Sequence, residues 1–459
     1  MSEGQIILLG GTFPMNNASV KTRQRGKHST LGVIVLILLF LCFPPGLTFL
    51  QPGTSMGPGT VAVCLVALAI AAIRLRLHVR RKLLRPGSMV FVLPAMACLV
   101  SVHFLIASRL LPVDTGRFIG SLIVFILLVI TARVIIPAIF GVESGKAVRI
   151  VFYAMVACAA LAAANITLPG LPYFYKPVFP FTEPSHFALA FLPLLMWACV
   201  TSSGWMRHLC LLAGIAIAGL LQNLTLIVGI ILVAIVYAPL LRASLIIGVI
   251  AGAALVASPD LTYYSDRLQF STDTDNLSVL VYLQGWQMAE ESIRNSSGWG
   301  VGFQQSGVNG SDSEATRVIN AVTQGEDSNL LDGGFLMVKL LSDFGVFAII
   351  ATAFYVRLLT RSFQRLRAVA LGKVQFDDGT VFAHAVVAMY SVEAFVRSNG
   401  YLVGTFVLFI GAVMHLHRVE RSQRHASTAG ARGGRSLAAA SIDAGSSPAF
   451  GVGSLPRTN

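Results

Sequence analysis

The sequence predicts an all-α fold, a polytopic membrane bundle of about twelve transmembrane helices with one large loop outside the membrane. Of its 459 residues, 55% are hydrophobic and only 12% are charged, whereas soluble domains carry roughly a quarter charged residues. Apolar runs long enough to cross about 30 Å of hydrocarbon recur from one end of the chain to the other. Because these runs are continuous and not alternating, they predict helices.

The predicted spans differ in length, and one of them is short. The run at 208–221 crosses the membrane only if it tilts or if the bilayer thins, or it joins the run at 224–240 as a broken or re-entrant pair. In chain order, the predicted spans are residues 31–50, 58–73, 88–107, 118–140, 147–164, 185–203, 208–221, 224–240, 243–258, 334–356, 380–396 and 401–416.

The distribution of charge predicts the topology of these spans. With the N-terminus inside, the inner segments hold 25 of the 34 Lys and Arg residues, and the outer segments hold 7. The outer segments also hold 13 of the 21 acidic residues. Basic loops stay in the cytoplasm, so both termini are expected there. The net charge of +13 follows from this topology, and no nucleic-acid partner is expected.

Five segments follow from this division of the chain. Residues 1–30 form a basic cytoplasmic N-terminus, and residues 31–258 hold nine spans. Residues 259–333 form the large outer loop, which contains 11 acidic and 3 basic residues. Residues 334–416 hold three more spans. Residues 417–459, rich in Ala, Gly, Ser and Arg with few large apolar side chains, are predicted to be a disordered cytoplasmic tail.

The first stretch whose side chains are candidates for a chemical role is Phe181–Ala188, at the outer mouth of the sixth span. A carboxylate such as Glu183 is costly at a membrane boundary unless it has partners or water. Pro184 suits the first turn of the following helix, where its missing N–H is harmless. The alternative to a functional role is a helix-entry cap with a solvated carboxylate.

Two further stretches frame the end of the large loop. Residues 285–303 combine an amphipathic helix with a Gly-rich turn, where backbone can approach a ligand closely. The structural alternative is a helix stop followed by a tight turn. Residues 328–347 place Asp332 at the outer entry of the tenth span and Asp343 deeper within it.

Together these stretches resemble the Wzy-type polysaccharide polymerases of the O-antigen ligase/polymerase superfamily. Glu183–Ala188 matches that family's Glu-Pro-Ser-x-Phe-Ala stretch at the start of a span. Trp286–Gly302 is similar to its loop stretch ending in Gly-x-Gly, and Asp332–Leu336 with Phe344-Gly345 is similar to the entry of its next span. In order, spacing and topology the likeness extends over about residues 30–416.

Two departures from the family pattern matter. Ser296 stands where the loop stretch commonly has Pro. O-antigen ligases carry a His about eleven residues before the Gly of the last motif, and here that position is Gly334, next to Phe335. The missing His favours a polymerase over a ligase, which remains the nearest alternative.

The resemblance implies a GT-C-like helical bundle in the bacterial inner membrane that polymerises undecaprenyl-pyrophosphate-linked oligosaccharide units, as for O-antigen or exopolysaccharide, at the periplasmic face. Its partners would be that lipid-linked oligosaccharide, membrane lipid, a flippase and a chain-length regulator. The acidic residues of the loop are scattered, and the six cysteines lie in apolar runs. A metal-independent reaction without a cofactor is therefore expected.

Such a transfer needs a carboxylate to accept the proton of a sugar hydroxyl, and Glu183 is the preferred candidate, with Asp332 second. It also needs positive charge for the departing pyrophosphate, best supplied by Arg. Arg397 is the first candidate, although it also lies four residues after Glu393, at the spacing of a local ion pair. The further candidates for binding the glycan or pyrophosphate are Arg294, Arg267, Lys176, His186, Trp286 and Trp299.

Four of these further candidates have a structural alternative. For Arg267 and Arg294 a solvated loop side chain is the favoured alternative. The tryptophans, which would stack on sugar rings, are equally consistent with interfacial anchors.

Two other function classes remain open from the sequence. A lipid-linked sugar flippase or transporter without catalysis would have a similar hydropathy, but transporters commonly show paired halves and short loops. The single 75-residue acidic loop at 259–333 fits an enzyme better. A structural subunit of an export complex is the last alternative.

Overall fold

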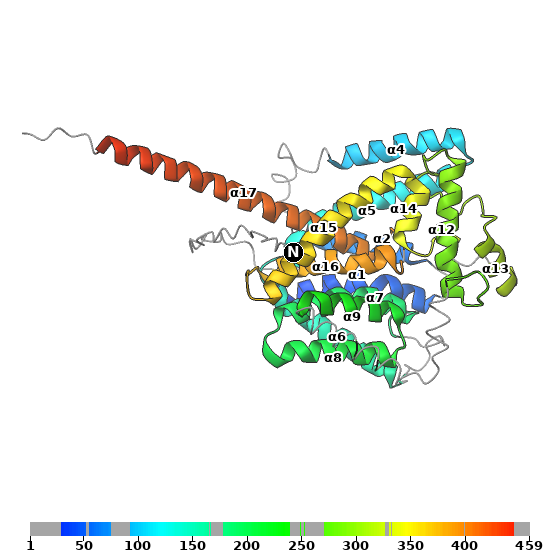
Figure 1. The fold of residues 1–459 in the computed structure, drawn as a ribbon, viewed down its shortest axis with the longest axis horizontal. Helices are drawn as coiled ribbons and strands as arrows, with labels where there is room; N and C mark the ends of the chain where they lie inside the picture. Colours follow the sequence, from blue (N-terminus) through cyan, green and yellow to red (C-terminus); the bar gives the residue numbers. More distant parts are fainter. Residues whose placement is uncertain are drawn as a thin grey trace, which may run out of the picture.

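The chain folds as a bundle of helices in a computed structural model (Figure 1). The structure describes residues 29–51, 55–74, 92–164, 166, 178–238, 248, 252, 270–325, 330–331, 333–398 and 400–444. Within these ranges the only β structure is an isolated bridge between Val178 and Phe181. The helices are α1 (Thr30–Leu50), α2 (Met56–Arg74), α4 (Val92–Leu110), α5 (Thr115–Ile139), α6 (Ser144–Ala163), α7 (Pro184–Thr201), α8 (Gly204–Leu220), α9 (Leu224–Tyr237), α12 (Leu277–Asn295), α13 (Glu314–Val322), α14 (Leu336–Phe344), α15 (Val346–Ala370), α16 (Asp378–Phe395) and α17 (Gly404–Ala444).

Seven helices of the described ranges are long and apolar enough to cross a membrane, which agrees with a polytopic membrane protein. They are α1, α2, α4, α5, α6, α7 and α15, each with 18 to 25 suitable residues. The runs predicted at 208–221 and 224–240 form α8 and α9, which have 17 and 14 residues. The run predicted at 243–258 lies almost entirely outside the described residues.

Helices α7 and α16 form the centre of the bundle, packed against each other. Both bury side chains on all sides, as expected for a helix that is apolar around its whole circumference. Phe187, Phe191 and Trp197 of α7 are almost completely buried. The ends of these two helices therefore bring distant parts of the sequence together.

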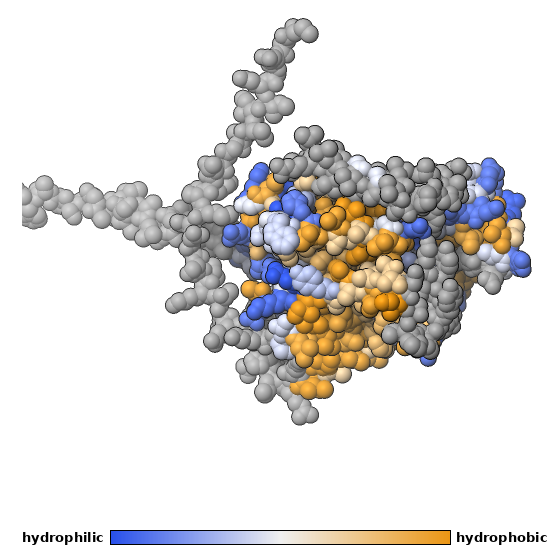
Figure 2. Space-filling model, turned by 90° about the horizontal axis from the view of Figure 1, so that it is seen from below, coloured by the Kyte–Doolittle hydropathy of each residue, from blue (hydrophilic) through white to orange (hydrophobic). Residues whose placement is uncertain are grey.

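The outside of the bundle is apolar. On α4, Leu99 and Leu105 expose 71% and 62% of their surface, and on α15 Phe354 exposes 71%. Figure 2 shows a broad apolar area on another face of the molecule. Apolar surface of this extent is unfavourable in water, which agrees with a membrane protein.

Helix α12 lies across one end of the bundle, with α13 beyond it, as Figure 1 shows. We call this end the loop end and the opposite one the tail end. Helix α12 packs against α13 on one side and α14 on the other. The part of the large loop that the structure describes is thus a folded layer over the ends of the spans.

The tenth predicted span, residues 334–356, is wrong in its limits. The chain forms a short helix, α14, breaks at Gly345, and starts α15, which continues to Ala370. Gly345 has φ +53°, and a Cβ atom there would clash with the carbonyl oxygen of Gly298. Only glycine fits this close approach, and an apolar run does not reveal it.

The C-terminal segment also differs from expectation. Helix α17 continues to Ala444, where the sequence analysis predicts disorder from residue 417. Few large apolar side chains mean that this part cannot build a core of its own, but Ala, Arg and Gln are good helix formers. The composition is therefore compatible with a helix.

Candidate functional site

Glu183 occupies the residue immediately before α7, at the loop end. Pro184 takes the first helical position, as expected from its fixed φ and missing N–H. The Glu183 side chain makes no capping hydrogen bond to the helix backbone. Its Oε2 instead accepts a hydrogen bond from the hydroxyl of Ser185 at 2.8 Å. Glu183 therefore stands at the N-cap position, as the helix-entry alternative has it, but its carboxylate binds the Ser185 hydroxyl and no backbone N–H of the helix.

Arg397 lies two residues beyond the end of α16 and binds the same carboxylate. Its Nη2 is 3.1 Å from Oε2 of Glu183, across 214 residues of sequence. The local pair with Glu393 does not form, because Glu393 is buried and accepts a hydrogen bond from Thr405. The Nε of Arg397 is buried without a hydrogen-bond partner among the described residues, so part of its donor capacity is unused.

His186 completes the group around Glu183. Its Nε2 lies 3.9 Å from Glu183 Oε2, and its Nδ1 is 3.4 Å from the hydroxyl of Thr182. The Glu183 side chain keeps 48% of its surface exposed, whereas that of Arg397 keeps 23% and that of His186 15%. The carboxylate is therefore the accessible member of the group.

Two opposing effects set the pKa of Glu183. Partial burial raises it, because a carboxylate loses hydration there. The positive charge of Arg397, followed by that of His186 and by the hydrogen bonds, lowers it by more. The net pKa lies below the ordinary value of 4.5, so Glu183 is a carboxylate at neutral pH.

The turn at Gly333–Phe335 joins this group to the loop. The backbone N–H of Ser398, next to Arg397, donates to the carbonyl of Gly334 at 3.2 Å. Phe335 stacks on Tyr282 of α12 with ring centroids 4.6 Å apart and meets Trp286 edge-on at 5.7 Å. The three sequence stretches that suggested a site therefore converge at one end of the bundle.

Trp286 and Trp299 differ in their surroundings. Trp286 is 45% exposed, so one part of its ring is open to a ligand. Trp299 stacks on His103 of α4, with centroids 5.1 Å apart, and its indole N–H donates to the His103 carbonyl. His103 Nε2 in turn lies 3.0 Å from the carbonyl of Trp299. Trp299 thus fastens the loop to α4.

The other predicted basic residues do not join the group. Arg294 pairs with Glu290 one turn before it on α12, and both side chains are mostly exposed. The candidates Arg267, Lys176 and Asp332 lie outside the described residues.

Asp343 is a key residue that sequence analysis placed without assigning a role. It is completely buried, and its two carboxylate oxygens accept the backbone N–H groups of Gln304 and Ser306, each at 3.0 Å. It therefore fixes the Gly-rich turn of the loop against α14. The signal was an acidic residue inside an apolar run, which needs a specific partner.

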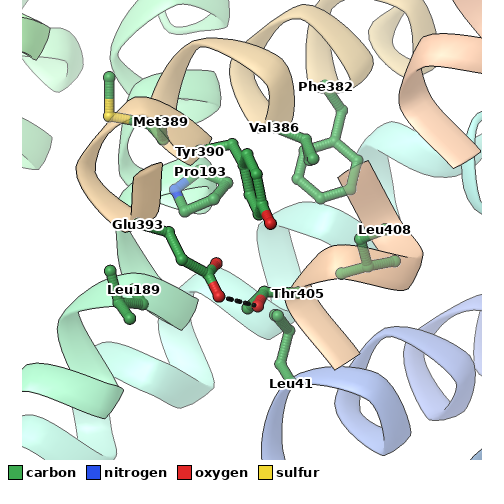
Figure 3. A pocket seen from close by; sticks show the side chains of 10 residues that line it. All are labelled: Leu41, Leu189, Pro193, Phe382, Val386, Met389, Tyr390, Glu393, Thr405 and Leu408. Atoms are coloured by element: carbon green, nitrogen blue, oxygen red, sulfur yellow. Dashed lines mark hydrogen bonds between the residues drawn. The ribbon is translucent and has the colours of Figure 1, made fainter. Parts of the chain in front are cut away.

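A small cavity lies inside the bundle, between side chains of α1, α7, α16 and α17 (Figure 3). It has a volume of about 20 Å³, and polar groups of Glu393, Tyr390 and Thr405 border it among apolar side chains. This is room for about one water molecule and not for a sugar. A glycan substrate would therefore have to bind outside it, where Glu183 is exposed.

Metal-ligating side chains do not gather in the described ranges, where no group of three or more His, Cys, Asp or Glu residues is found. One Asp-x-Asp triplet does occur, at Asp273–Asp275, which the sequence analysis overlooked. Both carboxylates are exposed, and Asp273 accepts a hydrogen bond from Ser271. The triplet belongs to the turn that leads into α12.

Comparison with protein-family models, curated proteins and solved structures gives no match for this chain.

Proposed function

We propose that this protein is a polysaccharide polymerase of the bacterial inner membrane, which joins undecaprenyl-pyrophosphate-linked oligosaccharide units at the periplasmic face. The observation that carries the proposal is the pair formed by Glu183 and Arg397 beside the Gly333–Phe335 turn. A proton acceptor and a guanidinium meet at one end of an apolar bundle, where a lipid-linked sugar has its polar part.

The proposed reaction is a single transfer at the anomeric carbon of the donor. Glu183 accepts the proton of the acceptor sugar hydroxyl, whose oxygen forms the new glycosidic bond. The bond between the anomeric carbon and the pyrophosphate oxygen breaks, and its electron pair leaves with undecaprenyl pyrophosphate. Arg397 binds that leaving group, since a guanidinium bonds two phosphate oxygens at once.

The pair also suggests how substrate activates the base. In the free protein the charge of Arg397 lowers the pKa of Glu183. When a pyrophosphate takes Arg397 as its own partner, that effect weakens, and the effect of burial, which raises the pKa, gains weight. Glu183 then becomes a stronger base at the moment when the donor is bound.

Two other features support the proposal. Trp286 exposes part of its ring near Phe335, and aromatic faces pack against the C–H faces of sugars. The folded layer of α12 to α14 lies on the end of the bundle that the distribution of charge predicts to be periplasmic.

Reconstitution tests the activity. Purified protein in liposomes receives lipid-linked repeat units and no other protein, and the products are separated on a gel. A ladder of chain lengths is expected from a polymerase. Transfer of one intact glycan to a different acceptor would identify a ligase instead, and the absence of any new glycosidic bond would leave a transporter or a structural subunit.

Arg397→Ala tests the leaving-group contact in the same assay. The loss of a charged hydrogen-bond donor is expected to slow ladder formation about ten- to hundredfold. Arg397→Lys, which keeps the charge but not the fork, is expected to recover part of the rate. Arg294→Ala is the matched control and should polymerise as the wild type does. A wild-type rate for Arg397→Ala would exclude Arg397 from pyrophosphate binding.

A further inference from the structure

A second cavity, of about 600 Å³, lies at the tail end of α16. Thr380 and His384 of α16 line it together with Phe376, which precedes α16, and α15 and α17, which pack against α16, supply the rest of the lining. From Thr380 to Arg397 the chain advances 17 residues, about 25 Å along a helix. This cavity is therefore separated from the candidate catalytic group by most of a membrane thickness.

The cavity carries positive charge. Arg361 and Arg365 of α15 and Arg424 of α17 line it, with Glu420 as the acidic residue among its lining side chains. Arg361 Nη1 and the Glu420 carboxylate are 4.0 Å apart, a distance that leaves this pair loose. The guanidinium groups of Arg361 and Arg365, with Glu420 as the acidic lining residue, favour an anion with several acceptor oxygens, such as a phosphate.

The cavity also has an apolar side. Leu358, Leu416 and Val419 contribute to its lining; Leu358 lies within one turn of Arg361 on α15, and Leu416 and Val419 lie within about one turn of Glu420 on α17. Leu358 lies one turn after Phe354, which is 71% exposed on the lipid-facing surface of α15. Charged and apolar lining thus meet where a membrane-spanning helix ends.

We propose that this cavity binds the phosphate group of an anionic membrane lipid, with the arginines on the phosphate and an acyl chain along α15. A free phosphate shares the headgroup chemistry, but it would leave the apolar side of the cavity in contact with water. Basic pockets between membrane-spanning helices bind such headgroups elsewhere. The site lies at the tail end, which the distribution of charge predicts to be cytoplasmic, and does not depend on the polymerase activity.

Titration with short-chain phosphatidylglycerol, followed by native mass spectrometry of the full-length protein in detergent, tests the proposal. The wild type is expected to bind it in preference to short-chain phosphatidylcholine and to glycerol 3-phosphate. Arg361→Gln with Arg365→Gln is expected to weaken that binding at least tenfold, because two charged donors are lost.

Arg357→Gln with Arg421→Gln is the matched control. Both residues are exposed on α15 and α17, outside the cavity lining, and their replacement removes the same charge. This variant should bind as the wild type does. Equal weakening in both double variants, or no preference for the anionic lipid, would overturn the proposal. Equally tight binding of glycerol 3-phosphate would overturn the assignment to a lipid.

Discussion

Two arginine–glutamate pairs at the loop end show how differently the same two side chains can be placed. Arg294 and Glu290 are one turn apart on α12, and 73% and 69% of their side-chain surfaces are exposed. Arg397 and Glu183 come from positions 214 residues apart, and only 23% of the Arg397 side chain is exposed. The first pair follows from helical spacing, whereas the second exists only because α7 and α16 pack together.

The difference in exposure and in sequence separation distinguishes an ordinary surface pair from a candidate functional pair. An exposed pair one turn apart on a helix contributes roughly 0.3–0.5 kcal/mol and is largely screened by water and salt. A pair held at the ends of two buried helices has a fixed geometry and a shifted pKa, which are the properties expected of reacting groups. Comparing variants of the two pairs therefore tests the proposed function.

The largest expected effect comes from Glu183→Gln. If Glu183 is the base, its replacement by an uncharged isostere should slow polymerisation by about 10² to 10⁴, the usual contribution of general base catalysis. Glu290→Gln, the same change in the exposed pair, should leave the ladder unchanged. Equal rates for the two variants would exclude Glu183 as the base.

A smaller effect is expected from Asp343→Asn, which tests what holds the loop layer to the bundle. The amide retains one acceptor for the two N–H groups of Gln304 and Ser306, so at least one buried donor loses its partner. The free energy of unfolding should fall by about 2–3 kcal/mol. Denaturation of Glu290→Gln, expected within about 0.5 kcal/mol of the wild type, is the control. A similarly small change in Asp343→Asn would mean that the turn is held by other contacts.

The pH dependence gives the smallest effect. The folded-state pKa of Glu183 is below 4.5, so the stabilisation from its pair with Arg397 is complete above that pH. It is lost as the pH falls through the folded pKa. The same lowered pKa governs activity, because kcat/KM reports the ionisation of groups in the free protein. Glu183 is already mostly ionised at pH 5, so kcat/KM should change less than about twofold between pH 5 and 7. The acid limb of the kcat profile should lie at higher pH than that of kcat/KM, because in the complex the bound pyrophosphate shares Arg397 with Glu183. If the two acid limbs coincide, Arg397 does not pass from Glu183 to the pyrophosphate.

Much of the bundle is predictable from the sequence because lipid imposes a simple rule. A segment in hydrocarbon must pair all its backbone N–H and C=O groups internally, so it becomes a long apolar helix. The predicted run at 31–50 agrees with α1 within one residue. The break at Gly345 was not predictable in this way. It depends on the approach of Gly298 from the loop, and hydropathy contains no information about that contact.

The candidate site was predictable in its members and not in its pairing. Arg397 stands out because basic residues are scarce in the outer segments, and Glu183 because a carboxylate at a membrane boundary needs partners or water. Their mutual contact needs the packing of α7 on α16, which no local spacing reveals. Trp299 is the opposite case. The sequence suggested that it stacks on a sugar ring, but its indole stacks on His103 and donates a hydrogen bond to the His103 carbonyl.

The junction between α14 and α15 has a consequence for motion. Three backbone hydrogen bonds cross it: Val301 to Ser342, Gly302 to Asp343, and Val346 to Gly298. Because these bonds tie the Gly-rich turn to the start of α15, we expect the two to open as one cooperative unit. The turn cannot swing on its own as a gate. If the proposed polymerisation needs a hinge, we expect that hinge elsewhere in the chain.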